Sequence, residues 1–138
     1  MLVAIQFILL GLLLFSTPLR LFKILPLVLI TMSLLLVLWA VMAMQKSRLR
    51  ISPVPAADSK LVSNGPYKFL RHPMYTSIIM GAAGLLTMHF SWPRLFFAVA
   101  LLLLLLIKLH WEEDLLSNKF KDYKDYKRGT KKIIPFLY

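Results

Sequence analysis

Long runs without a charged side chain are the feature that most restricts how this chain can fold. Three of them lack Lys, Arg, Asp and Glu altogether, at residues 1–19, 24–45 and 73–93. A membrane-spanning helix needs roughly 20 mostly apolar residues, because the α-helix rises about 1.5 Å per residue and the hydrocarbon core is about 30 Å thick. A fourth run at 95–107 becomes long enough if Arg94 and Lys108 extend to the two membrane interfaces. The sequence therefore predicts an all-α integral membrane protein with about four transmembrane helices, at about 1–19, 24–45, 73–92 and 94–116.

The composition agrees with a membrane protein. Hydrophobic residues make up 59% of the 138 residues and charged residues only 17%, whereas soluble domains average roughly 45–50% and 25%. A chain of this length supports one core, so we expect a single membrane-embedded domain over residues 1–138. The chain has no cysteine, which excludes disulfides, thiolate metal ligands and cysteine nucleophiles. The three histidines are scattered along the chain, and no metal site is expected.

The charged residues are concentrated in two segments. Residues 46–72 carry six basic residues against Asp58 alone, and the segment after Trp111 carries seven basic and five acidic residues. Lys and Arg accumulate in the cytoplasmic loops of membrane proteins, so we expect the 46–72 loop, the 117–138 tail and both termini in the cytoplasm. We therefore interpret the net charge of +11 as a consequence of a multi-pass topology and of contact with membrane lipid. Nucleic acid is not expected as a partner, because no nucleic-acid-binding module is recognisable.

The stretch GPYKFLRHPMY, residues 65–75, places cations between two prolines directly before the third apolar run. Asn64-Gly65-Pro66 is a turn signal, and Pro73 suits a first helical turn while disfavouring a helical conformation at the preceding residue. Arg71 and His72 are therefore expected at the cytoplasmic mouth of a helix, where exposed N–H groups favour negative charge. Two interpretations stay open on this basis: a basic topology anchor, or a pocket for a carboxylate or phosphate.

The stretch KLHWEEDLL, residues 108–116, places three consecutive acids just beyond the fourth apolar run. Because Glu112 and Glu113 are adjacent, they point to different faces of a helix. One interpretation is a solvated helix end in which Lys108 and Glu112 form an i,i+4 pair. The other is that one glutamate accepts hydrogen bonds from hydroxyls or an ammonium of a ligand.

The tail spaces Phe120, Tyr123 and Tyr126 among lysines near helical intervals, which predicts a basic amphipathic helix up to Gly129. Such a helix can adsorb to anionic lipid at the membrane surface. It can also act as a lid between the loop and Glu112. The small residues of GAAG, at 81–84, predict a face on which helices pack closely.

Taken together, LVSNGPYKFLRHPMY, an apolar helix pair and EEDLLSNKFKDYKDYKRGTKKIIP resemble the isoprenylcysteine carboxyl methyltransferase family, and more loosely the phospholipid N-methyltransferases. The family pattern is LV-x-x-G-x-Y followed by RHPxY, then EE-x-x-L, a Phe, a Tyr and a terminal Pro. These elements occur in order over residues 60–138. The eukaryotic members carry an Arg where Lys108 stands here, and many members carry an Arg at the position of Lys132.

The resemblance implies a membrane methyltransferase that uses S-adenosyl-L-methionine, with a cytoplasmic cofactor pocket formed by the loop and the C-terminal amphipathic helix. Carried over residue by residue, it implies roles in catalysis for Arg71 and His72 and in substrate binding for Lys108. The cofactor-binding residues that it implies are Leu61, Val62, Tyr67, His72, Pro73, Tyr75, Glu112 and Glu113.

The acceptor implied is a small lipophilic molecule or lipid that carries a carboxylate, thiol or amine, and methylation takes place at the cytoplasmic membrane face. An amine acceptor has to lose a proton, and His72 is the nearest candidate base. Two alternatives stay open. One is an NADPH-dependent reductase of the related sterol-reductase superfamily, in which Arg71 and the basic tail hold a phosphate, and the other is a non-catalytic membrane protein.

Overall fold

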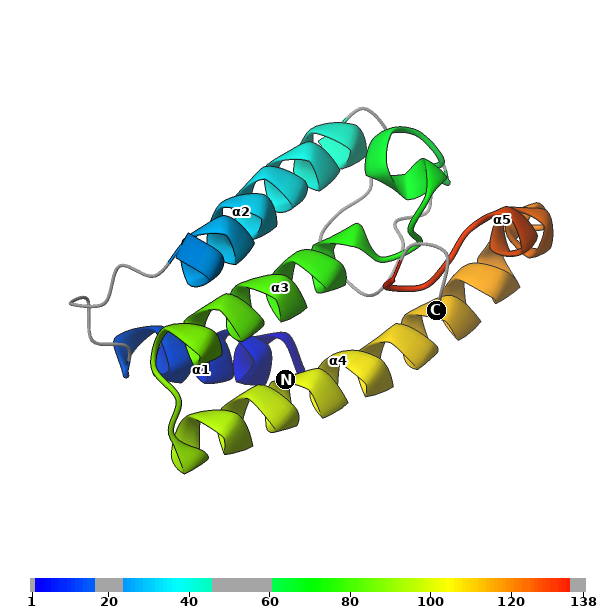
Figure 1. Ribbon diagram of the computed structural model, residues 1–138. Coiled ribbons are helices and arrows are strands. Elements are labelled where there is room, and N and C mark those ends of the chain that lie inside the picture. Colours follow the sequence, from blue (N-terminus) through cyan, green and yellow to red (C-terminus); the bar gives the residue numbers. More distant parts are fainter. Residues whose placement is uncertain (1, 17–23, 46–60, 135–138) are drawn as a thin grey trace.

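The computed structural model of the protein describes residues 2–16, 24–45 and 61–134 (Figure 1). Within these ranges the chain is helical, with short turns and one isolated β-bridge. Residues 46–60 of the expected loop and the C-terminal residues from Pro135 onward lie outside the described residues. The elements in chain order are α1 (Leu2–Phe15), α2 (Ile24–Gln45), the 3-10 turn η1 (Gly65–Lys68), α3 (Pro73–Met88), α4 (Trp92–Lys119) and α5 (Tyr123–Gly129).

The all-helical prediction is confirmed for the described residues, and α2 has the expected bounds. By length and composition, α2 and α4 are long and apolar enough to cross a membrane, whereas α1 and α3 are shorter apolar helices. At about 1.5 Å per residue, α1 and α3 extend over about 21 and 24 Å, less than the roughly 30 Å hydrocarbon core. Four transmembrane spans therefore stay a prediction.

The apolar surface of α2 is largely uncovered by the rest of the protein. Only 11% of its most apolar 18-residue window is buried, and Leu35, Leu38, Trp39 and Met42 are all about half exposed or more. A soluble protein rarely leaves such a continuous apolar patch in water. This surface is of the kind that a lipid bilayer covers.

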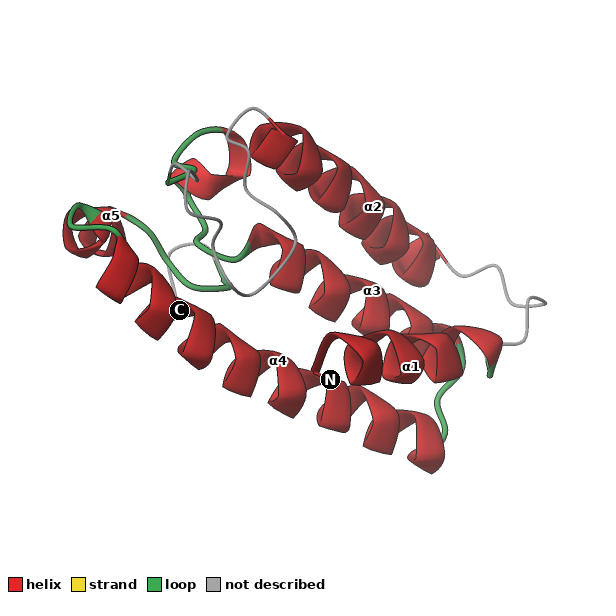
Figure 2. Cartoon of the chain, turned by 180° about the vertical axis from the view of Figure 1, so that it is seen from behind, coloured by secondary structure: helices red, strands yellow, loops and turns green. Residues whose placement is uncertain are grey.

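The helices pack in two pairs, with α2 along α3 and α1 along α4 (Figures 1 and 2). At the first interface a Cβ on Gly84 would lie 2.9 Å from Ile30 Cγ1 and 3.2 Å from the Pro26 carbonyl oxygen. A Cβ on Gly81 would lie 3.0 Å from Ser33 Oγ. The expectation that GAAG is a helix-packing face is therefore confirmed, and the partner is α2 of the same chain.

The Arg94 side chain folds back onto the end of α3 instead of extending away from the bundle, as the sequence reasoning had expected it to do. Its side chain is buried and donates hydrogen bonds to the carbonyl oxygens of His89 and, at 2.6 Å, Leu85. These carbonyls lie at the C-terminal end of α3, where backbone acceptors lack helical partners. Arg94 therefore serves as a cap for α3. Lys108 is also buried, at 5% exposure, and its side chain lines a cavity inside the bundle.

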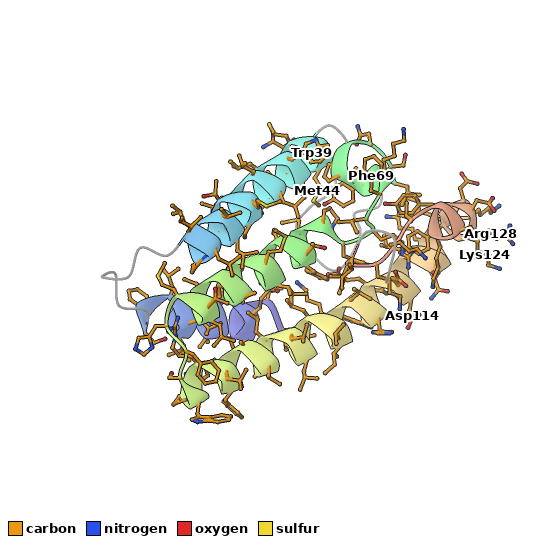
Figure 3. All side chains as sticks on the ribbon, viewed as in Figure 1. Trp39, Met44, Phe69, Asp114, Lys124 and Arg128 are labelled. Atoms are coloured by element: carbon orange, nitrogen blue, oxygen red, sulfur yellow. The ribbon has the colours of Figure 1, made fainter. Side chains whose placement is uncertain are left out.

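The C-terminal end of α4 extends beyond the apolar part of the bundle. A helix of 28 residues measures about 42 Å, roughly 12 Å more than the hydrocarbon core, so we call residues 112–119 the emergent end of α4. Asp114, Lys124 and Arg128 lie together at this end of the molecule (Figure 3). The charged tail thus lies beside the N-terminal end of α3, which we call its helix mouth.

Candidate functional site

The turn before α3 depends on Gly65. Its φ is +59°, in the left-handed region, and a Cβ there would lie 3.1 Å from Ala43 Cβ and 3.3 Å from Trp39 Nε1. Only glycine combines that backbone conformation with such close contact to α2. Pro66 follows in the first turn of η1, and Tyr67 is buried against α2. The turn predicted from Asn64-Gly65-Pro66 is confirmed, and it positions the polar segment that leads into α3.

Arg71 joins three parts of the site. Its Nε donates a hydrogen bond of 2.6 Å to Glu113 Oε1 on the emergent end of α4. Its Nη1 donates to the carbonyl oxygens of Lys127, at 3.0 Å, and of Thr130, both in the tail. The side chains of Arg71 and Glu113 are only 6% and 4% exposed. Arg71 is therefore largely occupied in holding the tail and α4 at the mouth of α3.

Glu113 is the common acceptor of this cluster. Lys127 Nζ lies 3.2 Å from its Oε2, and His72 Nε2 lies 3.6 Å from its Oε1. Burial works against ionisation, but His72, Arg71 and Lys127 outweigh it and hold the pKa of Glu113 well below its ordinary range. The carboxylate is therefore charged and committed to protein partners.

The tail is docked on the site by its backbone as well. The amide nitrogens of Arg71 and His72 donate to the carbonyl oxygens of Lys131, at 2.7 Å, and Lys132, at 3.1 Å. The Lys131 amide donates back to the Phe69 carbonyl at 3.1 Å. Tyr126 Oη donates to the Tyr67 carbonyl at 2.7 Å. Of the two interpretations of the amphipathic tail, this contact supports the one in which the tail covers the site.

His72 is the N-cap residue of α3 and lies outside the helical region, as Pro73 predicts. Its ring stacks on Tyr75 with 5.3 Å between the ring centroids and 4° between the planes. Its Nδ1 lies 3.8 Å from Glu112 Oε2. Its Nε2 is buried and has no hydrogen-bond partner among the described residues. At 3.6 Å from Glu113 Oε1, this nitrogen faces the Glu113 carboxylate and forms an ion pair with it when the imidazole is protonated.

Lys108 reaches inward from α4 at the same level. Its Nζ donates a hydrogen bond of 3.2 Å to Gln6 Oε1 on α1 and lies 5.1 Å from the centroid of the Tyr75 ring. Glu112 Oε1 is 3.9 Å away, which is beyond hydrogen-bond distance. The i,i+4 pair expected from the sequence is therefore loose, and the Gln6 amide is the closer partner.

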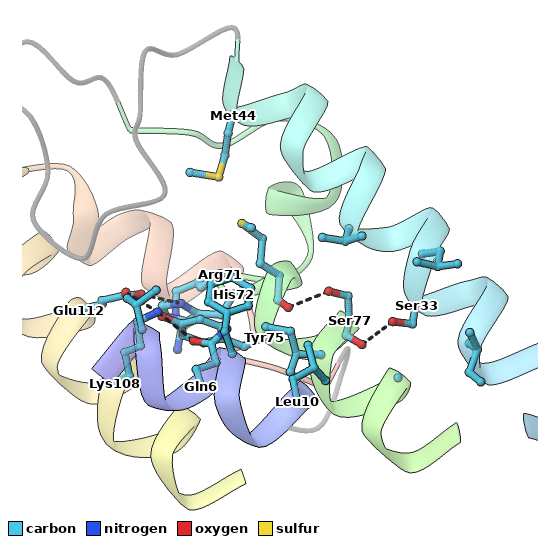
Figure 4. Close-up of a pocket in the computed structure, with 18 of the residues that line it drawn as sticks. Gln6, Leu10, Ser33, Met44, Arg71, His72, Tyr75, Ser77, Lys108 and Glu112 are labelled. Carbon is cyan, nitrogen blue, oxygen red and sulfur yellow. Dashed lines mark hydrogen bonds and ion pairs between the residues drawn. The ribbon is translucent and has the colours of Figure 1, made fainter. Parts of the chain in front are cut away.

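These side chains surround one end of a cavity of about 440 Å³ (Figure 4). The polar end is lined by Gln6, Tyr67, Arg71, His72, Tyr75, Lys108 and Glu112. From there the cavity continues between α1, α2 and α3 along almost entirely apolar side chains, such as Leu10, Ile78 and Leu85. A molecule with a polar group at one end and an apolar body fits such a space.

The structure separates the residues predicted for the site into two groups. Tyr67, Arg71, His72, Tyr75, Lys108 and Glu112 line the cavity together. The described lining does not include Leu61, Val62, Pro73 or Glu113. Val62 instead packs with Ala40, Ala43 and Tyr67, and Pro73 is buried in the first turn of α3. The individual roles of all these residues in cofactor binding, substrate binding and catalysis stay predictions.

The different faces expected for Glu112 and Glu113 are confirmed, since Glu112 lines the cavity while Glu113 binds Arg71. Gln6 and Thr130 are site residues that the sequence reasoning missed. Gln6 could have been predicted as a site residue, because it is the single polar side chain within the apolar helix α1. Thr130 had no such signal, since it acts mainly through its backbone carbonyl. Among the described residues, no three His, Cys, Asp or Glu side chains are grouped so that they could hold a metal ion.

Comparison with known proteins gives three findings. A family model described as phospholipid methyltransferase matches residues 21–123. The chain is 35% identical over 81 residues to the nickel-cobalt-cadmium resistance protein NccN of Alcaligenes xylosoxydans xylosoxydans. It is 31% identical over 81 residues to the cobalt-zinc-cadmium resistance protein CzcN of Cupriavidus metallidurans. Both alignments cover 58% of this chain and only 38% of the relative.

Proposed function

The chain belongs to the phospholipid methyltransferase family, and from this premise we propose that it transfers a methyl group from S-adenosyl-L-methionine to a small lipophilic acceptor at the cytoplasmic membrane face. The observation that carries the proposal is the two-part cavity. Its polar end joins the helix mouth of α3 to the emergent end of α4, and its apolar part continues between three helices. A water-soluble cofactor and a membrane-dissolved acceptor could meet only in a space that has both surfaces.

The residues at the polar end fit the cofactor chemically. The cofactor carries an ammonium group and ribose hydroxyls, and a carboxylate readily accepts hydrogen bonds from both. Glu112 keeps acceptor capacity for them, because the nearest cationic atoms lie 3.8 and 3.9 Å from its oxygens. The His72 ring, which stacks on Tyr75 and lines the cavity, offers a further contact. We therefore assign Glu112, His72 and Tyr75 to cofactor binding.

The chemistry asks mainly for positioning. When bound, the cofactor would supply a methyl carbon on a sulfonium, which a lone pair of the acceptor could attack while the bonding electron pair stays on sulfur. The side chains at the polar end would position the two reactants, and a productive geometry asks for about 3–3.5 Å between the reacting atoms. The apolar walls exclude water from the reacting atoms. For an amine acceptor, His72 is the nearest group that could take the proton.

The reductase alternative is less well supported by the geometry. In that alternative Arg71 would bind a phosphate of NADPH. The Arg71 guanidinium, however, already donates hydrogen bonds to Glu113 and to two carbonyl oxygens of the tail. The names of the relatives could suggest direct binding of nickel, cobalt or cadmium. We do not propose it, because the described residues include no group of three His, Cys, Asp or Glu side chains that could hold a metal ion. Methyl transfer is the function that we retain.

The test is isothermal titration of S-adenosyl-L-methionine into the detergent-solubilised protein, with NADPH as the comparison ligand. Wild type should bind the methyl donor and not NADPH. Glu112→Gln should weaken binding by about tenfold or more, the value of one hydrogen bond to a charged group. Asp114→Asn is the matched control, since Asp114 is exposed on the same helix and should leave affinity unchanged. A folded wild type that shows no binding of the donor would refute the proposal.

A further inference from the structure

The two ends of the cavity differ in how far their lining side chains are exposed. In the apolar part, Phe7 and Leu14 on α1 and Leu34 on α2 line the cavity and are more than half exposed. At the polar end, four lining side chains are no more than 9% exposed: Tyr67, His72, Tyr75 and Lys108. The cavity is therefore open on its apolar side and largely closed at the end that we assign to the methyl donor.

The methyl donor is charged and water-soluble, so the open apolar side is a poor route for it. A charged group that passes through hydrocarbon loses its hydration, which carries a large free-energy cost. The donor therefore has to reach Glu112 from the water side, at the emergent end of α4. Because the polar end is largely closed, exchange of the donor requires a part of the protein to move.

The tail lies across this closed end. Tyr67, Arg71 and His72 all line the polar end, and each of them forms a hydrogen bond with the tail. The Thr76 hydroxyl, in the first turns of α3, donates a further hydrogen bond of 2.7 Å to the Ile133 carbonyl oxygen. Movement of the tail would thus uncover the wall of the polar end.

The closed position of the tail depends on a small number of contacts. Its helix α5 has only seven residues, and an isolated helix of that length is not stable in water. Glu113 contributes twice, since it binds Arg71, which donates to two tail carbonyls, and it also pairs with Lys127. Glu113 is not among the residues that line the cavity. A segment held in this way can open locally while the bundle stays folded.

We propose, on the basis of the proposed function, that Glu113 is a positioning residue that controls exchange of the methyl donor. Through Arg71 and Lys127 it keeps the tail closed over the polar end, and the donor enters and leaves when the tail opens. The apolar side of the cavity stays open in both positions of the tail. This role differs from the direct cofactor contact that the family resemblance implies for Glu113.

The experiment measures the association and dissociation rates of radiolabelled S-adenosyl-L-methionine with the detergent-solubilised protein by rapid filtration. Glu113→Gln destabilises the closed tail in the free and in the donor-bound protein alike. Both rates should therefore rise together, by about 30- to 150-fold, the factor expected for loss of a buried charge pair that keeps a neutral hydrogen bond. The affinity is the ratio of the two rates and should change by less than about threefold. Loss of a direct donor contact would instead speed dissociation only and would weaken the affinity.

Asp125→Asn is the matched control on the tail itself. It also neutralises one acid, and it removes an ion pair of 3.4 Å with Arg128 in which both side chains are more than 80% exposed. Exposed ion pairs contribute little to stability, so both rates should equal those of wild type.

A disulfide provides a second test that does not depend on the folding of Glu113→Gln. The chain has no cysteine, and Leu70 and Lys131 form the isolated β-bridge between the helix mouth and the tail. Bridged residues lie about 4.8 Å apart, within the range that a disulfide spans. Once mass spectrometry has verified the bond, oxidised Leu70→Cys/Lys131→Cys should exchange the donor at least about tenfold more slowly than the same protein after reduction.

The outcomes separate the two proposals. A folded wild type that does not bind the donor would refute the proposed function. Normal binding by wild type with an unchanged association rate in Glu113→Gln, or equal exchange by the oxidised and reduced double variant, would overturn the inference about the tail alone.

Discussion

The buried pair of Arg71 and Glu113 permits a test of how the tail is held on the site. In Glu113→Gln the side chain keeps its shape and one acceptor oxygen but loses its charge. Arg71, with a side chain only 6% exposed, then lacks its counter-charge. Breaking a buried ion pair costs about 3–5 kcal/mol, and the remaining neutral hydrogen bond reduces this to about 2–3 kcal/mol. Lys127 loses its carboxylate partner at 3.2 Å as well.

The loss should appear as local opening of the tail rather than as global unfolding. Three amides report on the docked tail, those of Arg71, His72 and Lys131, because each donates across the contact between the helix mouth and the tail. If exchange follows the opening equilibrium, about 2–3 kcal/mol corresponds to about 30- to 150-fold faster hydrogen exchange at these amides. Amides within α3 and α4 should exchange at the wild-type rate.

The matched control is Glu112→Gln, which removes the neighbouring carboxylate without touching Arg71. Its side chain lines the cavity, and its nearest cationic atoms lie 3.8 Å or more away. The three reporter amides should therefore be unaffected. Equal acceleration in both variants, or protection of the three amides in Glu113→Gln as strong as in wild type, would refute the assignment of Glu113 to tail docking.

Two further predictions concern packing and pH. Gly84→Ala should destabilise the packing of α2 on α3 by about 1–3 kcal/mol, because the new Cβ would lie 3.2 Å from a backbone oxygen. Gly11→Ala is the control, since a Cβ there meets nothing within 4 Å. Thermal denaturation in detergent should therefore show a lower midpoint for Gly84→Ala than for Gly11→Ala. Because the pKa of folded Glu113 is depressed, its contribution to tail docking is present above the ordinary carboxyl pKa of about 4.3 and is lost as pH falls toward the lower folded value. Opening of the tail, corrected for intrinsic exchange rates, should thus be constant from neutral pH to about pH 5 and increase below it, and the increase should be absent in Glu113→Gln.

Local features of the chain could be read correctly from the sequence because they depend on neighbouring residues. The turn at Gly65 and Pro66, the helix start at Pro73 and the close-packing face of GAAG all follow from backbone sterics or residue size. The bounds of α2 follow from a continuous apolar run. The end of α3, at Met88 instead of the expected residue 92, could not be predicted, because it depends on a contact from the next helix, that of Arg94 with the Leu85 carbonyl.

The sequence by itself determined which parts make up the site: apolar helices, a basic loop, a His-Pro pair at the start of a helix, and two adjacent glutamates. Because the two glutamates are adjacent in a helix, their side chains had to point to different faces. Only the tertiary structure decided that Glu112 lines the cavity while Glu113 binds Arg71, 42 residues away, and that Gln6 meets Lys108 across 102 residues. The physical reason is that a buried charge takes whichever partner the packing of the helices brings within reach. No periodicity along one segment specifies that partner.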